Sequence, residues 1–238
     1  VIFDEFHERS LQADTGLAFV LDAQRHLAPD LRILVMSATL DGDAVAALLD
    51  RAPLLTSLGR TYPVALHYLP RDLTGPLPPV VSQAVCAALR QHPGDVLVFL
   101  PGAREIRQTQ ALLQSALAGD AIAVHALYGD LPWEAQDRAI RPGGGQRKVV
   151  LATPIAETSL TIEGVCIVVD AGYARVPQFD PASGLSRLHT QRISRASAEQ
   201  RAGRAGRTAP GVCYRLWSAS TQRGLVPHPA AEMRTKRA

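Results

Sequence analysis

The stretch that decides the fold is the run Val96-Leu97-Val98-Phe99-Leu100, which precedes a helix-like segment at Arg104–Leu117. A continuous run of branched and aromatic apolar residues is typical of a parallel strand that helices cover on both faces. Three more strands and a second crossover helix are expected after it, at Ala121–Ala126, Val149–Ala152, Val165–Val169 and Pro132–Ile140. This alternation of strands and helices predicts doubly wound α/β layers.

Two such domains are expected, with a boundary near residue 60. At the beginning of the chain, Val1–Phe3 and Leu31–Met36 should be strands, with a helical segment around Leu11–Leu27 between them. Prolines then cluster, at Pro63, Pro70, Pro76, Pro78 and Pro79. Because proline interrupts both helices and strands, we predict a linker at residues 61–79. The expected domains are therefore residues 1–60 and 80–220, with a tail at 221–238.

Composition narrows the class of protein. The chain is 47% hydrophobic and 20% charged, which is typical of a folded α/β protein. It has no apolar run long enough to span a bilayer and no signal-peptide pattern at its start, so we expect no membrane partner. Cys86, Cys166 and Cys213 are far apart in apolar surroundings, which predicts free thiols and a cytoplasmic location.

Charge is distributed unevenly. Residues 1–60 carry five Arg against nine Asp and Glu, whereas residues 173–238 carry twelve Lys and Arg against three acids, a net charge of +9. A dense basic block is the usual footprint of a polyanionic partner. A solvated surface in an arginine-rich protein explains it equally well, so charge alone leaves both interpretations open.

Two strand ends carry side chains suited to nucleotide chemistry. Val1–Phe3 is followed by Asp4 and Glu5, at the carboxyl edge of a sheet where ligands bind in open α/β folds. Asp4 would hold a phosphate-bound Mg²⁺, and Glu5 would orient and deprotonate a water molecule. Ser37 and Thr39 follow the strand Leu31–Met36 and could relay hydrogen bonds from a nucleotide site. The alternatives are a polar strand cap and a strand-to-helix turn with Asp41 as the helix cap.

Residues 200–207, Gln-Arg-Ala-Gly-Arg-Ala-Gly-Arg, form the strongest single motif. If they are helical, Gln200, Arg204 and Arg207 lie at i, i+4 and i+7 on one face. The segment has no apolar side chain beyond alanine, so it should not be an ordinary core helix, and its glycines suggest close approach to another surface. Guanidinium groups in this arrangement suit a nucleotide γ-phosphate.

A polar loop is expected between two strands, at residues 152–164. Its hydroxyls and carboxylates could touch a ribose, a phosphate backbone, or both, although a solvent-exposed connection explains the composition as well. The Gly143-Gly144-Gly145 stretch is not a phosphate-binding loop, because Lys148 is followed by Val149 and opens a strand. We predict a turn there.

Taken in order, these elements resemble the motor of superfamily 2 helicases, and in detail its DEAH-box branch. Residues 4–7 stand where the family has Asp-Glu-Ala-His, and the other matching segments are 37–39, 98–102, 153–164 and 200–207. Phe6, with Ser10–Asp14 after it, makes the match closest to the bacterial HrpB type. The resemblance covers nearly residues 1–215, and it implies two tandem RecA-like parallel-sheet domains of which the first is incomplete.

The resemblance implies roles for the matching residues in an ATP- and Mg²⁺-dependent helicase that moves along single-stranded RNA or DNA. Asp4 would be the Mg²⁺ residue and Glu5 the catalytic base, with Gln200 placing the water. Arg204 and Arg207 would contact the phosphates across the domain cleft. The remaining positions would couple hydrolysis to movement (His7, Ser37, Thr39), lie near the ribose (Thr161, Glu163) and touch the nucleic-acid backbone (Gly102, Thr153).

Three departures from the family pattern stand out. No Gly-x-x-x-x-Gly-Lys-[Ser/Thr] loop occurs in the 238 residues, and the sequence starts and ends as a fragment would. Pro154 occupies a position that is usually Asn, which removes an N–H donor. We therefore expect ATPase activity of a longer parent protein. The alternative is that this chain by itself is a non-catalytic nucleic-acid-binding or scaffold domain.

Overall fold

The computed structural model describes residues 1–37, 42–57, 62–157, 160–180 and 185–228. Thr39, expected to follow the second strand, lies outside the described residues. The chain folds as two compact units, one built mainly from residues 1–59 and the other mainly from residues 60–177 and 188–228. None of the helices in these described ranges has the length and apolar character that a membrane crossing requires.

The first unit is a small α/β arrangement, as the sequence predicts. Strands β1 (Ile2–Phe3) and β2 (Leu34–Val35) pair in parallel, and helix α1 (Leu11–His26) connects them. Helix α1 begins at Ser10, whose side chain accepts a hydrogen bond from the Ala13 N–H. A short turn, η1 (Phe6–Glu8), precedes it, and α2 (Gly42–Leu48) follows β2.

A six-stranded, wholly parallel sheet forms the centre of the second unit. The strands lie in the order β3-β10-β7-β4-β6-β5. Their bounds are β3 Val64–Leu69, β4 Asp95–Phe99, β5 Ile122–Leu127, β6 Arg147–Ala152, β7 Val165–Asp170 and β10 Gly211–Ser218. The four predicted strands of this part of the chain, β4 to β7, are therefore confirmed.

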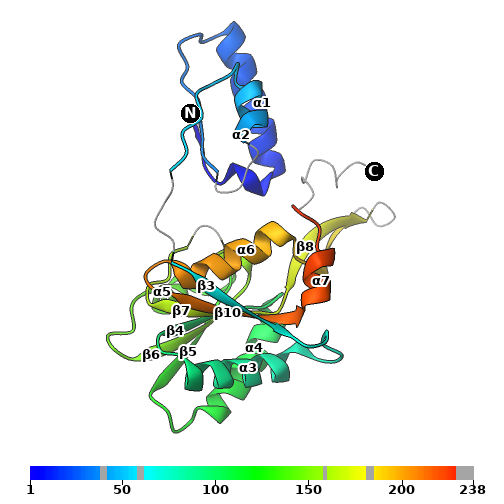
Figure 1. The fold of residues 1–238 in the computed structure, drawn as a ribbon. Coiled ribbons are helices and arrows are strands. Elements are labelled where there is room, and N and C mark those ends of the chain that lie inside the picture. The colour runs from blue at the N-terminus through cyan, green and yellow to red at the C-terminus, as the bar shows by residue number, and fades with distance from the viewer. Residues whose placement is uncertain (38–41, 58–61, 158–159, 181–184, 229–238) are drawn as a thin grey trace. The chain divides into compact units, whose positions relative to one another are not determined.

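Helices cover both faces of this sheet (Figure 1). Helices α3 (Leu77–Gln91) and α4 (Ala103–Ala116) pack on one face, and α5 (Trp133–Ile140) and α6 (Arg195–Gly203) on the other. The remaining elements are η2 (Pro154–Ala156), β8 (Tyr173–Asp180), β9 (Leu185–Arg192), η3 (Arg204–Gly206) and α7 (Ala219–Gly224). Strands β8 and β9 form a separate two-stranded sheet.

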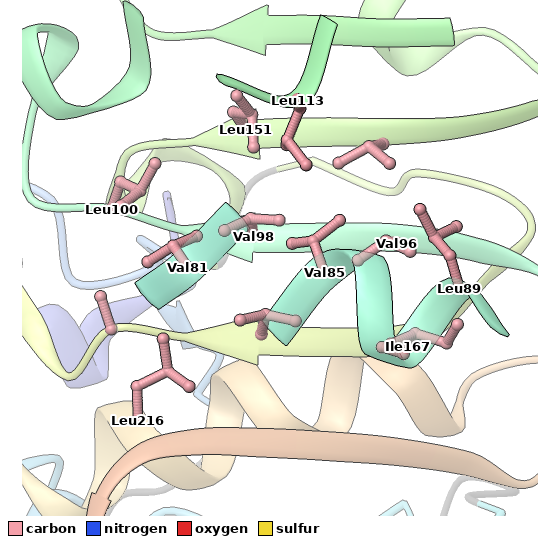
Figure 2. Close-up of a cluster of buried hydrophobic side chains, with 14 of the residues drawn as sticks. Val81, Val85, Leu89, Val96, Val98, Leu100, Leu113, Leu151, Ile167 and Leu216 are labelled. Atoms are coloured by element: carbon pink, nitrogen blue, oxygen red, sulfur yellow. The ribbon is translucent and has the colours of Figure 1, made fainter. Parts of the chain in front are cut away.

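The side chains of β4 alternate between two cores. Val96 and Val98 point into the cluster beneath α3 and α4, together with Val85 and Leu113 (Figure 2). Leu97 and Phe99 belong to the opposite cluster. All four β4 side chains are at most 1% exposed, and burying each contributes about 1.5–3 kcal/mol. This two-sided burial explains why the strand reads as a continuous apolar run.

The prediction of a linker at residues 61–79 is wrong for Val64–Leu69. These residues form β3, an edge strand whose neighbour β10 pairs with it in parallel. The prolines lie on either side of the strand, at Pro63 and Pro70, and the next group opens α3. Proline is tolerated at an edge and in the first turn of a helix, so the cluster marks the ends of elements instead of an unstructured segment.

Candidate functional site

The two carboxylates of the first unit lie directly after β1. Asp4 Oδ1 accepts the backbone N–H of Glu5 at 2.8 Å, and Glu5 has a left-handed backbone with φ of 49°. A non-glycine residue in this region is uncommon and costs conformational energy, and such strain gathers at functional sites. Phe6 holds the turn in place, because its side chain is buried and its N–H donates to the Met36 carbonyl at 3.1 Å.

His7 and Ser37 lie in the same unit. His7 Nδ1 is 3.4 Å from Glu5 Oε2, and the exposed fractions of the two side chains are 7% and 34%. Ser37 comes two residues after β2, the strand that pairs with β1. Since parallel strands end at one edge, the predicted residues Asp4, Glu5 and Ser37 all follow strand ends at the same edge of the small sheet.

The arginine-rich segment, residues 200–207, is not one continuous helix. Helix α6 ends at Gly203, and Arg204–Gly206 form the tighter turn η3. The Gly206 carbonyl accepts the Tyr62 N–H at 2.9 Å, a bond that holds the end of this turn beside the residues preceding β3. Gln200 lies in the α-helix and Arg204 in the tighter turn, but Gly203, Arg204 and Arg207 all keep right-handed helical backbone angles. The shared face of Gln200, Arg204 and Arg207 therefore stays a prediction.

The same segment is part of the core after all. Ala202 and Ala205 are at most 5% exposed and pack against sheet residues. Alanine is enough here because the backbone itself lies close to its neighbours. A Cβ on Gly206 would lie 2.6 Å from the Tyr62 carbonyl oxygen, whereas a Cβ on Gly203 would meet no heavy atom within 4 Å. The expected close approach is thus present at one glycine and absent at the other.

Arg201, which sequence reasoning passed over, is fully buried. Its Nε donates to Glu157 Oε2 at 2.8 Å, and its Nη1 donates to Asp170 Oδ1 at 3.0 Å. Nη1 also lies 3.3 Å from the Tyr173 carbonyl, and Cζ lies 4.9 Å from the centre of the Phe99 ring. One signal was available in the sequence. Arg201 is followed by the small residues Ala202 and Gly203, and an arginine that is buried beside such residues needs a charged partner in the interior.

Burial and ion pairing oppose each other in this group. It acts to lower the pKa of the Arg201 guanidinium, but the Asp170 and Glu157 carboxylates more than offset it and raise that pKa above its ordinary value. Burial raises the pKa of the Asp170 carboxyl, and the charge of Arg201 opposes the rise. Arg201 therefore remains a cation at all physiological pH values, which is what its two carboxylate partners require.

Arg204 and Arg207 bind the loop that contains Glu157, Leu160 and Thr161. The Nε of Arg204 donates to the Glu157 carbonyl at 2.9 Å, its Nη2 donates to the same oxygen, and its Nη1 donates to the Leu160 carbonyl at 2.6 Å. Arg204 is 7% exposed. Arg207 is exposed and donates from Nη1 to Thr161 Oγ1 at 2.7 Å. The arginine segment and this loop, predicted as separate motifs, are thus in direct contact.

Glu163 and Thr161 do not share surroundings. Glu163 is exposed and lies with Asp95 and Gly145 along a shallow hollow beside the amino ends of the strands.

Gly144 and Gly145 have φ of 60° and 97°, and the Gln146 N–H donates to the Gly143 carbonyl, so the predicted glycine turn is confirmed. Only glycine adopts such angles without strain.

Gly102 and Thr153 lie together at the carboxyl edge of the large sheet. They follow the adjacent strands β4 and β6, whose last residues Phe99 and Ala152 pair in register. The Thr153 N–H donates to the Leu127 carbonyl at 3.2 Å, which fixes its backbone to the end of β5. Gly102 is buried, and the guanidinium of Arg175 covers it, so that a Cβ there would lie 2.3 Å from Nη1.

A parallel sheet between two helical layers, with an arginine segment bound to the loop after β6, defines a RecA-like domain. The model of the helicase conserved C-terminal domain family matches residues 80–209. The chain belongs to this family, and its α/β fold is of the RecA type.

Two ATP-dependent RNA helicases are similar to this chain in sequence. The ATP-dependent RNA helicase HrpB of Escherichia coli K12 is 52% identical over 217 residues, which are 91% of this chain. The pre-mRNA-splicing factor ATP-dependent RNA helicase prp22 of Schizosaccharomyces pombe is 41% identical over 98% of the chain. The chain spans 27% and 20% of the lengths of these two proteins.

Two solved helicase structures are similar to this chain in fold. A crystal structure of the E. coli DEAH/RHA helicase HrpB superposes on 98% of this chain with a TM-score of 0.90 and 48% identity, and the match covers 30% of that structure. A second crystal structure, of the E. coli DExH-box NTPase HrpB, gives a TM-score of 0.89. The resemblance to DEAH-box helicases of the HrpB type, drawn from the motifs, is confirmed.

Proposed function

We propose that this chain is part of the motor of an ATP-dependent RNA helicase, in which ATP hydrolysis drives movement along single-stranded RNA. The supporting observation is the contact between the arginine segment and the loop at residues 157–161, made by Arg204 and Arg207. The names of both relatives support RNA as the track, and DNA is an outcome that the assay can detect. Residues 1–60 would be the end of a first RecA-like domain, and the second would begin with β3.

Asp4 and Glu5 would carry the chemistry at the strand end. The residues fit a magnesium ion, because Mg²⁺ in nucleotide sites takes one or two carboxylates, with waters and phosphates completing its shell. The exposed Asp4 supplies such a carboxylate, and the bound ion would neutralise phosphate charge. Glu5 would accept a proton from the attacking water, and His7, 3.4 Å from its carboxylate, would hold it in position.

The arginine segment would stabilise charge on the transferring phosphoryl group. Arg207 fits this role best, since it is exposed and holds Thr161 through one hydrogen bond. Arg204 would contribute less directly, because Nε, Nη1 and Nη2 already bind loop carbonyls. Gln200 would place the water. Of the two residues predicted near the ribose, Thr161 fits better, because its hydroxyl binds Arg207, whereas Glu163 lies beside the amino ends of the strands.

Gly102 and Thr153 would touch the RNA backbone at the carboxyl edge of the large sheet. A phosphate that approached Gly102 would meet the Arg175 guanidinium first, because that group covers the glycine. Ser37 and Thr39 would couple hydrolysis to movement in the first domain.

Substitution of Glu5 tests the proposal. In the full-length gene product, Glu5→Gln should abolish steady-state ATP hydrolysis, while the Kd of a fluorescent ATP analogue changes less than threefold. A glutamine keeps the size of the side chain but cannot accept the proton. Asp22→Asn on α1, whose side chain is 75% exposed, is the matched control and should leave turnover unchanged. Unchanged hydrolysis in Glu5→Gln contradicts the assignment.

The 238-residue chain provides a second comparison. It contains no phosphate-binding loop sequence, so alone it should bind RNA without hydrolysing ATP. Hydrolysis by the chain alone, sensitive to Glu5→Gln, would show that a different group binds the triphosphate.

A further inference from the structure

One buried cation joins three segments of the second unit. Arg201 on α6 binds Glu157, which lies just after η2, and Asp170, the last residue of β7. It also reaches the Tyr173 carbonyl, the first residue of β8. These segments are 44, 31 and 28 residues away from Arg201 in sequence.

Such a charge persists in the interior only because it is paired. A fully buried guanidinium without its carboxylates would carry a desolvation penalty of several kcal/mol, and two carboxylates without the guanidinium would repel each other. The pair Arg201–Asp170 is 1% and 0% exposed, and Glu157 is 11% exposed. The three groups must therefore move together, so Arg201 fixes the positions of Glu157 and Asp170 relative to each other.

Glu157 connects this ion-paired group to the residues proposed to contact RNA and to those proposed to contact phosphate. Its carboxylate binds Arg201, and its backbone carbonyl binds Arg204. Toward the amino end, Glu157 follows η2, whose cap is Thr153, the residue proposed to touch RNA. A displacement of Thr153 by RNA would thus reach Glu157 through one short turn, and Arg201 and Arg204 would receive it through Glu157.

We propose that Arg201 is a positioning residue: anchored by Asp170, it holds the Glu157 carboxylate, so that RNA binding at the Thr153 turn reaches Arg204 through the Glu157 carbonyl. Arg201 touches neither ATP nor RNA in this role. The inference rests on the proposed function, because it assigns a route between the two sites that the proposed function requires.

The test measures RNA stimulation, not activity alone. Glu157→Gln in the full-length gene product keeps the length of the side chain and one acceptor oxygen but removes the charge that faces Arg201. We expect the ratio of kcat with saturating single-stranded RNA to kcat without RNA to fall at least fivefold, measured at least 15 °C below the Tm of the variant. Glu157→Asp, which restores the charge on a shorter side chain, should recover part of the ratio.

The matched control is Arg141→Gln, which breaks an exposed ion pair with Asp137 on α5. It should leave the ratio within twofold of wild type. A lowered Tm in Glu157→Gln with an unchanged ratio overturns the proposal, because a purely structural group affects only the amount of folded protein. Wild-type protein that shows no RNA stimulation at all overturns the proposed function instead, so the two failures are distinguishable.

Arg201→Lys is the second variant, and it is expected to fold because it keeps the positive charge. Lysine cannot bind Glu157 and Asp170 with a planar fork, so the ratio should fall here too. A ratio that falls in Arg201→Lys and in Glu157→Gln, but no further in the double variant, supports one shared route. Additive losses contradict it.

Discussion

The two glycines of the arginine segment form a matched pair of substitutions with opposite expected effects on stability. A Cβ on Gly206 would lie 2.6 Å from the Tyr62 carbonyl oxygen and 2.8 Å from Val64 Cγ2. No side-chain rotation relieves a clash with a backbone oxygen, so either η3 or the start of β3 must move. A Cβ on Gly203 meets nothing within 4 Å, and its φ of −59° suits alanine.

The expected loss for Gly206→Ala is about 2–4 kcal/mol in the free energy of unfolding. Overpacking of a tight site costs roughly 1–3 kcal/mol. Weakening the 2.9 Å hydrogen bond from the Tyr62 N–H to the Gly206 carbonyl adds about 1 kcal/mol. Gly203→Ala should instead stabilise by about 0.5–1 kcal/mol, because alanine loses less backbone entropy than glycine at the end of a helix.

Thermal unfolding of the 238-residue chain, followed by circular dichroism, distinguishes these effects. A domain of this size shifts its Tm by about 2–4 °C per kcal/mol, so the two variants should differ by roughly 5–20 °C. Equal Tm values, or a Tm of Gly206→Ala at or above that of wild type, would refute the reasoning that ties Gly206 to close backbone packing.

Three other predictions concern the second unit. Lys148 is 1% exposed, and its ammonium group donates to three carbonyls at the end of α5, so Lys148→Met should lower the free energy of unfolding by about 2–3 kcal/mol in urea titrations. Burial raises the pKa of the Cys213 thiol to about 12, so at pH 8 iodoacetamide should label it only after unfolding, as mass spectrometry of the peptides would show. Because the unfolded thiol ionises first, Cys213 should also make stability fall as pH rises above about 9, an effect that Cys213→Ala removes. Gly102→Ala displaces the flexible end of Arg175, so RNA affinity should fall at least threefold in a filter-binding titration while Tm changes by less than about 3 °C.

Strands β4 to β7 of the large sheet were predictable, whereas β3 and β10 were not. Strands β4 and β6 are buried on both faces, so their residues give continuous apolar runs. Strand β3 lies at the edge with Leu66 43% exposed, and prolines flank it. Strand β10 contains Arg215, which is 3% exposed and donates to the Tyr68 hydroxyl and the Ala198 carbonyl. A buried charge whose partners lie on other elements breaks a hydrophobic pattern in a way that local sequence cannot explain.

The residues of the candidate site also differ in how far local sequence could predict them. The position of Asp4 and Glu5 directly after a strand could be predicted, because a strand followed by two carboxylates is a local pattern. The face of Gln200, Arg204 and Arg207 was predicted from the spacing of a single helix, whereas the segment changes from an α-helix to a tighter turn after Gly203. Arg201 was missed because its carboxylate partners lie 44 and 31 residues away, and only the folded sheet brings them together. Helical spacing describes one element, whereas this site depends on three.

The most direct test of a motor function is the steady-state rate of ATP hydrolysis by the full-length gene product, measured with Mg²⁺ as single-stranded RNA is titrated in, with DNA of the same sequence in parallel. We predict that RNA raises kcat several-fold to a plateau, and that the plateau disappears in Glu5→Gln. A rate that is the same with and without either nucleic acid, or that persists in Glu5→Gln, would contradict a nucleic-acid-driven motor built on these residues.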